Sequence, residues 1–427
     1  MKNIINLAWK NIWRNKVRSA VIISAIAIGL FSGTFLLAFM NGWILGTVDS
    51  DIRTQYSHIQ IHNTEFLANN DVGAYFMRDD IGRGVLHTPT LNTENETEIN
   101  GHIQGRMQYA PTVAYRLNLN GMLASAHNAL GITAKGVFPD EEMQVTDVWK
   151  HIADTMGVFL TDDSRMPIVI SSRTAEKLRV RLRSRIVFTF QDATGEMQSL
   201  AFRVGGIYRT TNAMFDEATV FVRYADILPY TALPEGAVHE TALLFPTIED
   251  ANLALPQIKA LFPDKTVRLW SELNPALAMY FSFTEFMGFI ILGIFLFALS
   301  FGIINTMLMA VLERTRELGM LGAIGMSKRN IFSMIMLETI FLTLVGGAIG
   351  IILGIAVILP TMETGIDLSF FMADQFEDFG FGSIVYPVFD FAMFIQVVAL
   401  VLAAGILSAI YPARKALKLK PLDAMRG

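Results

Sequence analysis

Four stretches of this sequence are too long and too apolar to belong to a domain that water surrounds. Residues 19–48, 286–312 and 391–413 contain no Asp, Glu, Lys or Arg, and residues 331–362 contain one acid, Glu338. Because an α-helix needs about 20 mostly apolar residues to cross a bilayer, each stretch predicts one membrane-spanning helix. The first stretch is also longer than the apolar core of a cleaved signal peptide, about 7–15 residues, so we expect a retained anchor.

The composition supports a membrane protein and excludes several other classes. Charged residues make up 17% of the 427 residues, against roughly 25% in soluble domains. A net charge of −5 lacks the positive surplus of nucleic-acid-binding domains, so we expect no nucleic acid partner. The chain has no cysteine, which excludes disulfides, thiolate metal sites and cysteine nucleophiles.

The positions of Lys and Arg predict the orientation of the four helices. Residues 363–390 have no Lys or Arg but several acids. Positive residues favour the cytoplasmic side of a membrane, so we expect both termini and residues 313–330 in the cytoplasm, and residues 49–274 outside. The positive residues near the helix ends are Lys2, Lys10, Arg14, Lys16, Arg18, Arg314, Arg316, Lys328, Arg329, Arg414, Lys415, Lys418, Lys420 and Arg426.

The first 18 residues predict an additional, shorter helix. Such an amphipathic helix lies in the membrane interface, with its tryptophans at the level of the lipid headgroups. Whether this helix does more than anchor the chain stays open. Its apolar side chains, which recur at helical spacing, are Ile4, Ile5, Ala8, Trp9, Ile12 and Trp13.

Residues 49–274 predict a folded α+β domain, in which the pattern favours two subdomains. Residues 87–103 lack periodicity and predict a loop. Helices are expected at 173–180 and 248–262. Strands are predicted from short apolar and alternating segments, namely residues 57–63, 112–120, 167–171, 185–190, 201–208, 218–223 and 241–245.

No catalytic constellation emerges from this domain. His58 and His62 are four residues apart in a predicted strand, hence about 13 Å apart, too far to share one metal. We interpret them as exposed strand histidines. The adjacent acids at 79–80, 141–142 and 162–163 point to opposite faces of the chain and predict a solvated surface. Since nucleophile-elbow, zinc-protease and P-loop motifs are missing, we expect no enzyme activity, no metal and no ATP site in this chain.

Residues 313–330 form a charged, glycine-rich connection between the second and third predicted helices. We expect the second helix to continue past the bilayer, the glycines to turn the chain, and Ser327 to cap the third helix. A short charged protrusion suits docking into a cleft of a soluble partner. A solvated hairpin has the same pattern, so both interpretations stay open. The residues concerned are Glu313, Arg314, Arg316, Glu317, Gly319, Gly322 and Gly325.

The third predicted helix carries two unusual features. Gly346, Gly347 and Gly350 form a small-residue face that allows another helix to approach closely. Glu338 lies about two turns inside the helix, where an acid is costly unless it is paired or functional. The alternative is a structural acid whose side chain reaches the interface.

Residues 305–350 contain a recognisable pattern. It consists of an Asn, then E-R-x-R-E-[IL]-G, then A-x-G, then a Glu and G-G-x-x-G in the next helix. The matching residues are Asn305, Glu313, Arg314, Arg316, Glu317, Gly319, Ala323, Gly325, Glu338, Gly346, Gly347 and Gly350. The pattern resembles the FtsX-like permease domain of the MacB/LolCDE superfamily of ABC transporters. The layout of one helix, a large outside domain and three further helices is also similar.

This resemblance implies a multi-pass permease of the bacterial inner membrane that forms a homo- or heterodimer. The dimer would bind two copies of a separate ATPase subunit, which holds the ATP and Mg²⁺, so this chain needs no cofactor. Residues 313–330 would be the loop that couples to the ATPase. The implied organisation is an interfacial helix at 1–18, a first membrane helix at 19–48, a periplasmic domain at 49–274 and a permease domain at 275–427, with helices near 280–312, 331–361 and 390–412.

Length and layout most resemble the lipoprotein-releasing permeases LolC and LolE. That resemblance implies extraction of lipoproteins from the inner membrane and delivery to a periplasmic carrier or adaptor. A MacB-like export permease and an FtsX-like regulator of a periplasmic cell-wall hydrolase are the alternatives. The residues expected to hold lipid chains, at the outer ends of the first two helices, are Phe39, Met40, Trp43, Ile44, Tyr280, Phe281, Phe283 and Phe286.

Overall fold

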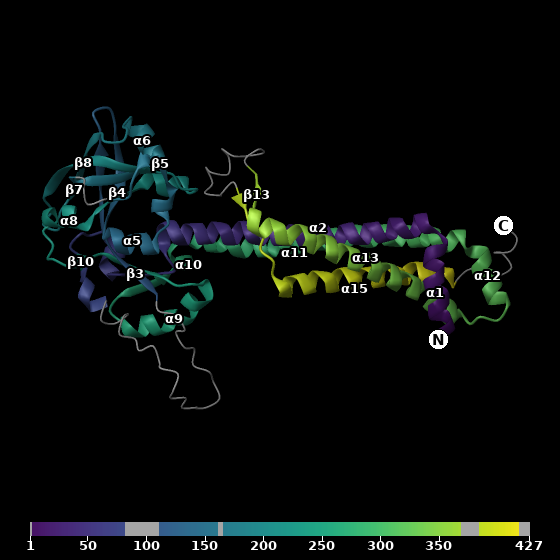
Figure 1. Cartoon of the computed structure of the whole chain (residues 1–427). Coiled ribbons are helices and arrows are strands. Elements are labelled where there is room, and N and C mark those ends of the chain that lie inside the picture. The colour runs from purple at the N-terminus through teal and green to yellow at the C-terminus, as the bar shows by residue number, and fades with distance from the viewer. Residues whose placement is uncertain (1, 82–110, 161–164, 369–383, 418–427) are drawn as a thin grey trace, which may run out of the picture. The chain divides into compact units, whose positions relative to one another are not determined.

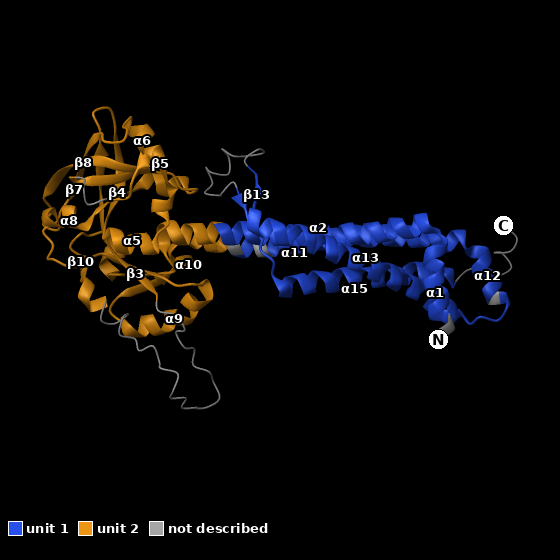
Figure 2. Cartoon of the chain, viewed as in Figure 1, with its two compact units in different colours: residues 1–46, 280–368, 384–427 blue, residues 47–279, 369–383 orange. Residues whose placement is uncertain are grey.

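The computed structural model of the chain divides into two compact units, which we describe separately (Figures 1 and 2). It describes residues 2–81, 111–160, 165–368 and 384–417. Unit 1 comprises residues 1–46, 280–368 and 384–427, and unit 2 comprises residues 47–279 and 369–383. The loop expected at 87–103 lies outside the described residues, as do Asp162 and Asp163.

Long helices dominate unit 1. The described part of the chain has four helices that are long and apolar enough to cross a membrane, which confirms the number predicted from the uncharged stretches. A two-stranded ribbon of β13 (Ile366–Asp367) and β14 (Ile384–Val385) follows the third of them. The helices are α1 (Lys2–Arg14), α2 (Lys16–Asp51), α11 (Pro275–Glu313), α12 (Thr315–Ala323), α13 (Lys328–Thr364) and α15 (Phe391–Ala416).

The glycines of α13 determine how closely its neighbours pack. A Cβ atom at Gly350 would lie 2.8 Å from the backbone oxygen of Ala27 in α2, and one at Gly346 would lie 2.9 Å from that of Ile23. Gly347 faces α15 instead, where a Cβ atom at this position would lie 3.3 Å from Cδ2 of Leu402. Because backbones can approach so closely only over small residues, these glycines let α13 pack against both α2 and α15.

Unit 2 is built on one ten-stranded sheet within the described residues. Its strand order is β12-β1-β11-β3-β4-β9-β6-β8-β5, and β7 pairs with both β3 and β8. Its strands are β1 (Ile59–His62), β3 (Thr112–Ala124), β4 (Ala129–Val137), β5 (Ile152–Gly157), β6 (Pro167–Ser171), β7 (Arg185–Gln191), β8 (Met197–Tyr208), β9 (Thr219–Arg223), β11 (Glu240–Leu244) and β12 (Thr266–Leu269), with a separate ribbon of β2 (Phe76–Met77) and β10 (Ala237–Val238).

Short helices cover the sheet of unit 2. A π-helical turn, η1 (Ile52–Tyr56), directly follows α2. The other helices are α3 (Thr64–Asn69), α5 (Pro139–Val145), α6 (Ser172–Leu178), α7 (Ala213–Ala218), α8 (Tyr224–Ile227), α9 (Ile248–Leu261) and α10 (Trp270–Leu273), with 3₁₀ turns η2 (Val148–His151) and η3 (Leu228–Tyr230).

The long strand β3 belongs to two parts of the unit 2 sheet. Its first half pairs with β11, while its second half pairs with β4 and β7. Since β7 also pairs with β8, the strands β3, β4, β9, β6, β8 and β7 close into a barrel. The open sheet β12-β1-β11 continues from the same β3. The barrel and the open sheet are thus two parts of unit 2 that share one strand, and the prediction of two subdomains stays a prediction.

The structure also corrects the interpretation of His58 and His62. Their side chains are 2% and 3% exposed, because both faces of this segment are covered, as the burial of Ile59, Gln60 and Ile61 shows. The ring of Phe245 lies near His58, and the ring of Phe66 lies near His62. The Nδ1 atom of His58 accepts a hydrogen bond from the backbone N–H of Phe245, at 3.1 Å. Burial, with help from the nearby positive charge of Arg53, lowers the pKa of His58 to about 4.

This depressed pKa predicts a loss of stability in acid. In the folded protein His58 stays neutral until the pH falls to about 4, whereas in the unfolded chain it is protonated below its ordinary pKa of 6.5. The unfolded chain binds that proton more readily, so we expect His58 to cost unit 2 roughly 2–3 kcal/mol of unfolding free energy across this range. The His58→Gln variant keeps an acceptor for Phe245 but does not titrate. Denaturant unfolding, followed by tryptophan fluorescence, should show a shallower acid decline for the variant than for the wild type.

Candidate functional site

The connection between α11 and α13 is a short helical protrusion. Helix α11 ends at Glu313, α12 runs from Thr315 to Ala323, and α13 begins at Lys328. The Ser327 side chain accepts a hydrogen bond from the backbone N–H of Asn330, at 3.3 Å, which confirms the predicted cap. The expectation that three glycines turn the chain was wrong, because Gly319 and Gly322 lie inside α12. The turn falls at Gly325, whose φ of +102° favours glycine.

Helix α12 buries one apolar side chain and exposes another. Leu318 is 6% exposed and packs in the core of unit 1, whereas Met320 is 53% exposed. Ile324, just past the end of the helix, is 79% exposed. Arg316 and Glu313 are also exposed on this protrusion. A protrusion of this kind offers apolar contacts with charged neighbours, which is the composition of a protein-binding surface.

Glu338 is buried and paired, although it lies within an apolar helix. Its side chain is 5% exposed. The Nδ2 atom of Asn11, in α1, donates to Oε1 of Glu338 at 2.6 Å. The Nη1 atom of Arg314 donates to both oxygens, at 3.1 and 3.2 Å. The alternative of a paired acid is thus the one observed, because two donors from different elements compensate the buried carboxylate.

A second carboxylate extends this network to the protrusion. The Nε atom of Arg314 donates to Oε2 of Glu317 at 3.0 Å, and Nη2 of Arg14 donates to Oε1 of Glu317 at 2.6 Å. Hydrogen bonds from Arg14, then from Arg314, lower the pKa of Glu317 and keep it ionised. The network therefore links α1, α12 and α13. We call it the polar junction and define it as Asn11, Arg14, Arg314, Glu317 and Glu338.

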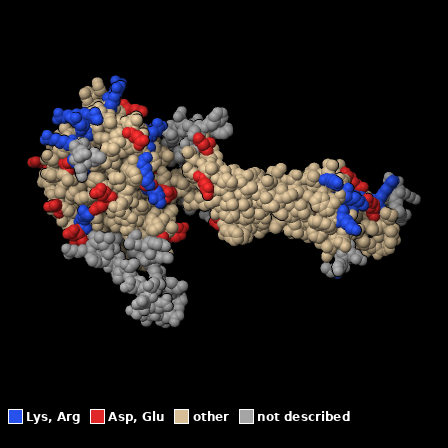
Figure 3. Space-filling model, viewed as in Figure 1, with Lys and Arg blue, Asp and Glu red and all other residues tan. Residues whose placement is uncertain are grey.

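The polar junction marks one edge of the apolar part of unit 1. Figure 3 shows that, on the visible face of unit 1, charged side chains gather over α1 and α12, next to a wide band without them. Arg18, near the start of α2, also lies close enough to Arg314 and Glu338 to interact with their charges. The uncharged part of α13 runs from residue 339 to 362, about 36 Å at 1.5 Å per residue. The first three turns of α13 thus belong with α12 to the charged end.

The other motif residues occupy different places in unit 1. Asn305 is exposed on α11, and the glycines of α13 serve helix packing. Of the four spanning helices, α11 has the least of its apolar surface buried. It exposes several large apolar side chains along its length, among them Phe297, Phe301 and Met309. This surface leaves α11 available for a further membrane partner.

The eight residues expected to hold lipid differ in exposure. Ile44 is buried, while Phe39, Met40 and Trp43 are half-buried in α2. Tyr280, Phe283 and Phe286 are exposed on α11, and the side chain of Phe281 is not among those described. Sequence reasoning missed a ladder of rings along α2, with centroids 5.8, 6.4 and 6.2 Å apart, although its spacing of four residues was a usable signal. The ladder consists of Phe31, Phe35, Phe39 and Trp43.

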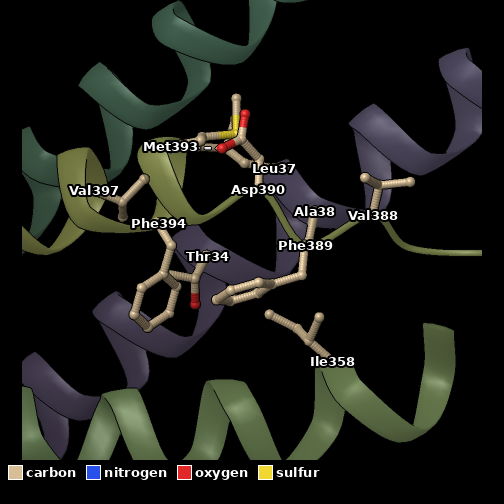
Figure 4. Close-up of a pocket in the computed structure, with 10 residues that line it drawn as sticks. All are labelled: Thr34, Leu37, Ala38, Ile358, Val388, Phe389, Asp390, Met393, Phe394 and Val397. Carbon is tan, nitrogen blue, oxygen red and sulfur yellow. Dashed lines mark hydrogen bonds between the residues drawn. The ribbon is translucent and has the colours of Figure 1, made fainter. Parts of the chain in front are cut away.

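A small cavity between α2, α13 and α15 is no ligand site (Figure 4). Its volume is about 10 Å³, which is room for about one water molecule. The only charged side chain that lines it, Asp390, caps α15 by accepting hydrogen bonds from the backbone N–H groups of Ala392 and Met393, at 2.8 and 3.3 Å. No group of His, Asp and Glu side chains in the described ranges is suited to hold a metal ion.

Residues 289–421 match the family model for the FtsX-like permease C-terminal domain. This part of the chain is therefore similar to the FtsX-like permeases of MacB-type ABC transporters. The match includes Arg314, Glu317 and Glu338 but not Asn11 or Arg14, so two members of the polar junction lie outside it.

Two relatives and one solved structure are similar to the chain to different extents. The chain is 21% identical to an uncharacterized ABC transporter permease of Methanocaldococcus jannaschii, over 100% of this chain and 98% of that protein. It is 34% identical to the macrolide export ATP-binding/permease protein MacB of Chlorobium luteolum, over 29% of this chain and 16% of that protein. The periplasmic region of MacB from Actinobacillus actinomycetemcomitans aligns with 55% of this chain, at 12% identity and a TM-score of 0.32.

Proposed function

We propose that this permease transmits movement rather than forming a through-pore, with α12 docking into a separate ATPase subunit. The observation that carries the proposal is the polar junction. It joins the exposed protrusion α12 to α13 and α1 through buried and charge-assisted hydrogen bonds. A partner that moves α12 would therefore move the charged end of unit 1 with it. ATP and Mg²⁺ would be bound by the ATPase, two copies of which would serve a permease dimer.

The dimer partner would contact α11 on its exposed surface. Polar side chains such as Asn305 favour association between helices in a bilayer because they find hydrogen-bond partners there. A second copy of this chain and a related permease are both compatible with that surface. The membrane would be the cytoplasmic membrane of a bacterium, with α12 in the cytoplasm and unit 2 on the other side.

For the substrate, we propose an amphipathic molecule that has a lipid-like part and is handled with a carrier or adaptor protein. Lipoprotein release is supported by the ring ladder of α2 and by the exposed aromatic residues of α11, which suit acyl chains. Export of a small molecule is the second candidate, because the matched part of the chain is 34% identical to a protein named for macrolide export. Depletion of the chain should strand lipoproteins in the inner membrane under the first proposal and leave their sorting normal under the second.

The proposed orientation predicts opposite labelling of two engineered cysteines. The chain contains no native cysteine, so each variant carries a single thiol. Ile324→Cys, next to α12, should react with a membrane-impermeant maleimide only after the cells are opened. Met214→Cys, 83% exposed in unit 2, should react once the outer membrane alone is permeable. Labelling of both positions from the same side would contradict the proposed transmembrane arrangement.

The docking role of α12 predicts a loss of ATPase binding when its apolar contacts are removed. Met320→Asp combined with Ile324→Asp replaces two exposed apolar side chains, so the fold of unit 1 should persist. At about 1–2 kcal/mol for each interface contact, we expect at least a tenfold weaker association with the ATPase in pull-down from mild detergent. The matched control Met214→Asp, in unit 2, should bind normally. Full association and full stimulated ATP turnover in the double variant would refute the docking role.

A further inference from the structure

Helix α1 presents a second face that the polar junction does not use. Its inner face packs on the core of unit 1, where Ala8, Asn11 and Ile12 are 0%, 9% and 2% exposed. Its outer stripe, which we define as Ile5, Trp9 and Trp13, is 42%, 42% and 48% exposed. These three residues are four apart and so lie along one side of the helix. Large apolar side chains on an otherwise polar helix surface indicate a binding surface.

The outer stripe lies at the level where the apolar part of unit 1 begins. The ring of Trp9 contacts the ring of Phe341 in α13, with centroids 5.4 Å apart. Asn11 bonds Glu338, directly before the uncharged part of α13. Tryptophan prefers the boundary between headgroups and acyl chains. The stripe is therefore placed where a bilayer surface would meet the helix.

The segment that carries the stripe has only positive ionisable side chains of its own, and the acids that contact α1, Glu317 and Glu338, come from other segments. The first 48 residues of the chain contain no Asp or Glu. Lys10 is exposed on α1, and Lys16 is exposed directly after it. Arg14 already has a carboxylate partner in Glu317, so among the side chains described up to residue 16, Lys10 and Lys16 are the cations available to a ligand beside the stripe. Apolar rings flanked by lysines complement a surface of anionic headgroups over acyl chains.

We propose that the outer stripe, with Lys10 and Lys16, binds anionic phospholipid headgroups, and that this binding holds α1 in the position from which Arg14 and Asn11 orient α12 and α13. The membrane thereby becomes a participant in coupling, since lipid on one face of α1 stabilises the polar junction on the other. The inference rests on the proposed docking of α12 to an ATPase for its consequence, but not for the lipid contact itself.

The lipid contact is tested with the full chain in phosphatidylcholine nanodiscs with or without phosphatidylglycerol. A Trp43→Phe background removes the other tryptophan of the spanning helices. Brominated phosphatidylglycerol should quench the remaining fluorescence more than brominated phosphatidylcholine, and Trp9→Phe with Trp13→Phe should remove that quenching. Lys10→Gln and Lys16→Gln should each weaken the preference for phosphatidylglycerol about fivefold. Lys177→Gln with Lys259→Gln, which removes two charges from unit 2, is the matched control and should not change it.

The coupling consequence is tested in the same nanodiscs with the ATPase bound. Stimulated ATP turnover should rise with phosphatidylglycerol in the wild type and lose that dependence in Lys10→Gln with Lys16→Gln. In Arg14→Gln, brominated phosphatidylglycerol should still quench the tryptophans. ATP turnover should no longer depend on phosphatidylglycerol, because the ion pair between residue 14 and Glu317 is gone. If no stimulated turnover occurs in either lipid, the docking proposal fails while the quenching result stands.

Three outcomes would overturn the lipid proposal. Equal quenching by both brominated lipids would show that the headgroup charge is not recognised. Protection of the tryptophans on addition of the ATPase would assign the stripe to that subunit. Cross-linking between two copies through Trp9→Cys would assign it to the dimer interface.

Discussion

Replacing Glu338 by leucine is expected to lower the free energy of unfolding of unit 1 by about 3–5 kcal/mol. The change removes the carboxylate that accepts from Asn11 and from Arg314. The Arg314 side chain is 13% exposed, so its charge would stay in a poorly solvated place with Glu317 alone as a partner. An uncompensated charge of this kind is costlier than the loss of the ion pair itself.

Thermal unfolding in detergent would measure this effect, and α13 offers a matched control. Glu363→Leu changes an exposed acid near the other end of the same helix and should shift the midpoint little. Glu338→Gln keeps an acceptor for Asn11 and should be intermediate. Combining Glu338→Leu with Arg314→Leu should restore much of the stability, because both charges are then absent. A Glu338→Leu midpoint equal to that of Glu363→Leu would show that the polar junction carries no stability.

The predictable parts of this fold are those that local sequence determines. Uncharged stretches of hydrocarbon length predicted the four long helices, because no other fold accommodates them in water or lipid. The alternation of apolar and polar residues, together with short apolar segments, predicted most strands of the unit 2 sheet. It missed β4, whose residues Gly131 and Gly136 weaken the pattern, although β4 pairs with β3 along nine residues. Strand β4 therefore forms because of its pairing with β3, which its own local sequence pattern does not reveal.

The partners of the predicted site residues were not predictable. Glu338 stood out as an acid in an apolar helix, but Asn11 is 327 positions away in sequence, and no local pattern connects them. Arg14 appeared only as one of several positive residues in the first helix. Gly319 illustrates the opposite error, since a glycine can follow a helical path when its neighbours pack, as Leu318 does here. Site geometry depended on tertiary contacts that sequence spacing does not encode.

Burial was equally hard to predict in unit 2, where charged residues form a closed network. Glu142, expected on a solvated surface, is fully buried, and both of its oxygens accept hydrogen bonds from Arg116, at 2.8 to 3.1 Å. Arg116 is 1% exposed and also donates to Glu240 at 2.5 Å. Lys135 completes the network. Burial opposes the ionisation of Glu240, but Lys135 and Arg116 outweigh it and lower its pKa to about 2.

This network holds the end of the first spanning helix. The backbone oxygen of Gln55, in η1, lies 3.4 Å from both Nη1 of Arg116 and Nζ of Lys135. Thr146 Oγ1 donates to the backbone oxygen of Arg53 at 2.9 Å. Cations are favourable at the C-terminal end of a helix, where carbonyl groups lack partners and the dipole is negative. The turn η1 that follows α2 is thus part of the hydrogen-bonded network of unit 2.

We expect Arg116→Leu to destabilise unit 2 by about 3–5 kcal/mol near neutral pH, because Glu142 and Glu240 would stay buried with only Lys135 to compensate them. Arg185→Leu, an exposed arginine on β7 of the same sheet, is the matched control and should be nearly neutral. The folded pKa of Glu240 lies below its ordinary value of 4.5. The ionised Glu240 therefore adds to the free energy of unfolding above pH 4.5, and this stabilisation is lost as the pH falls toward 2. The difference between wild type and variant should shrink in acid, and a difference that does not change with pH would contradict the ion-pair origin.

The milder change Thr146→Val separates stability from transmission. It deletes the hydroxyl that donates to the backbone oxygens of Arg53 and Thr54 in η1 and accepts from the backbone N–H of Val148. The charged network stays complete, so we expect a loss of only about 1–2 kcal/mol in unit 2. If movement passes from α2 into unit 2 through this turn, the variant should bind the ATPase and hydrolyse ATP normally while transport falls. Normal transport in Thr146→Val, with Arg116→Leu affecting stability alone, would mean that the network serves only the fold of unit 2. Movement would then reach unit 2 by another connection between the units, such as α11.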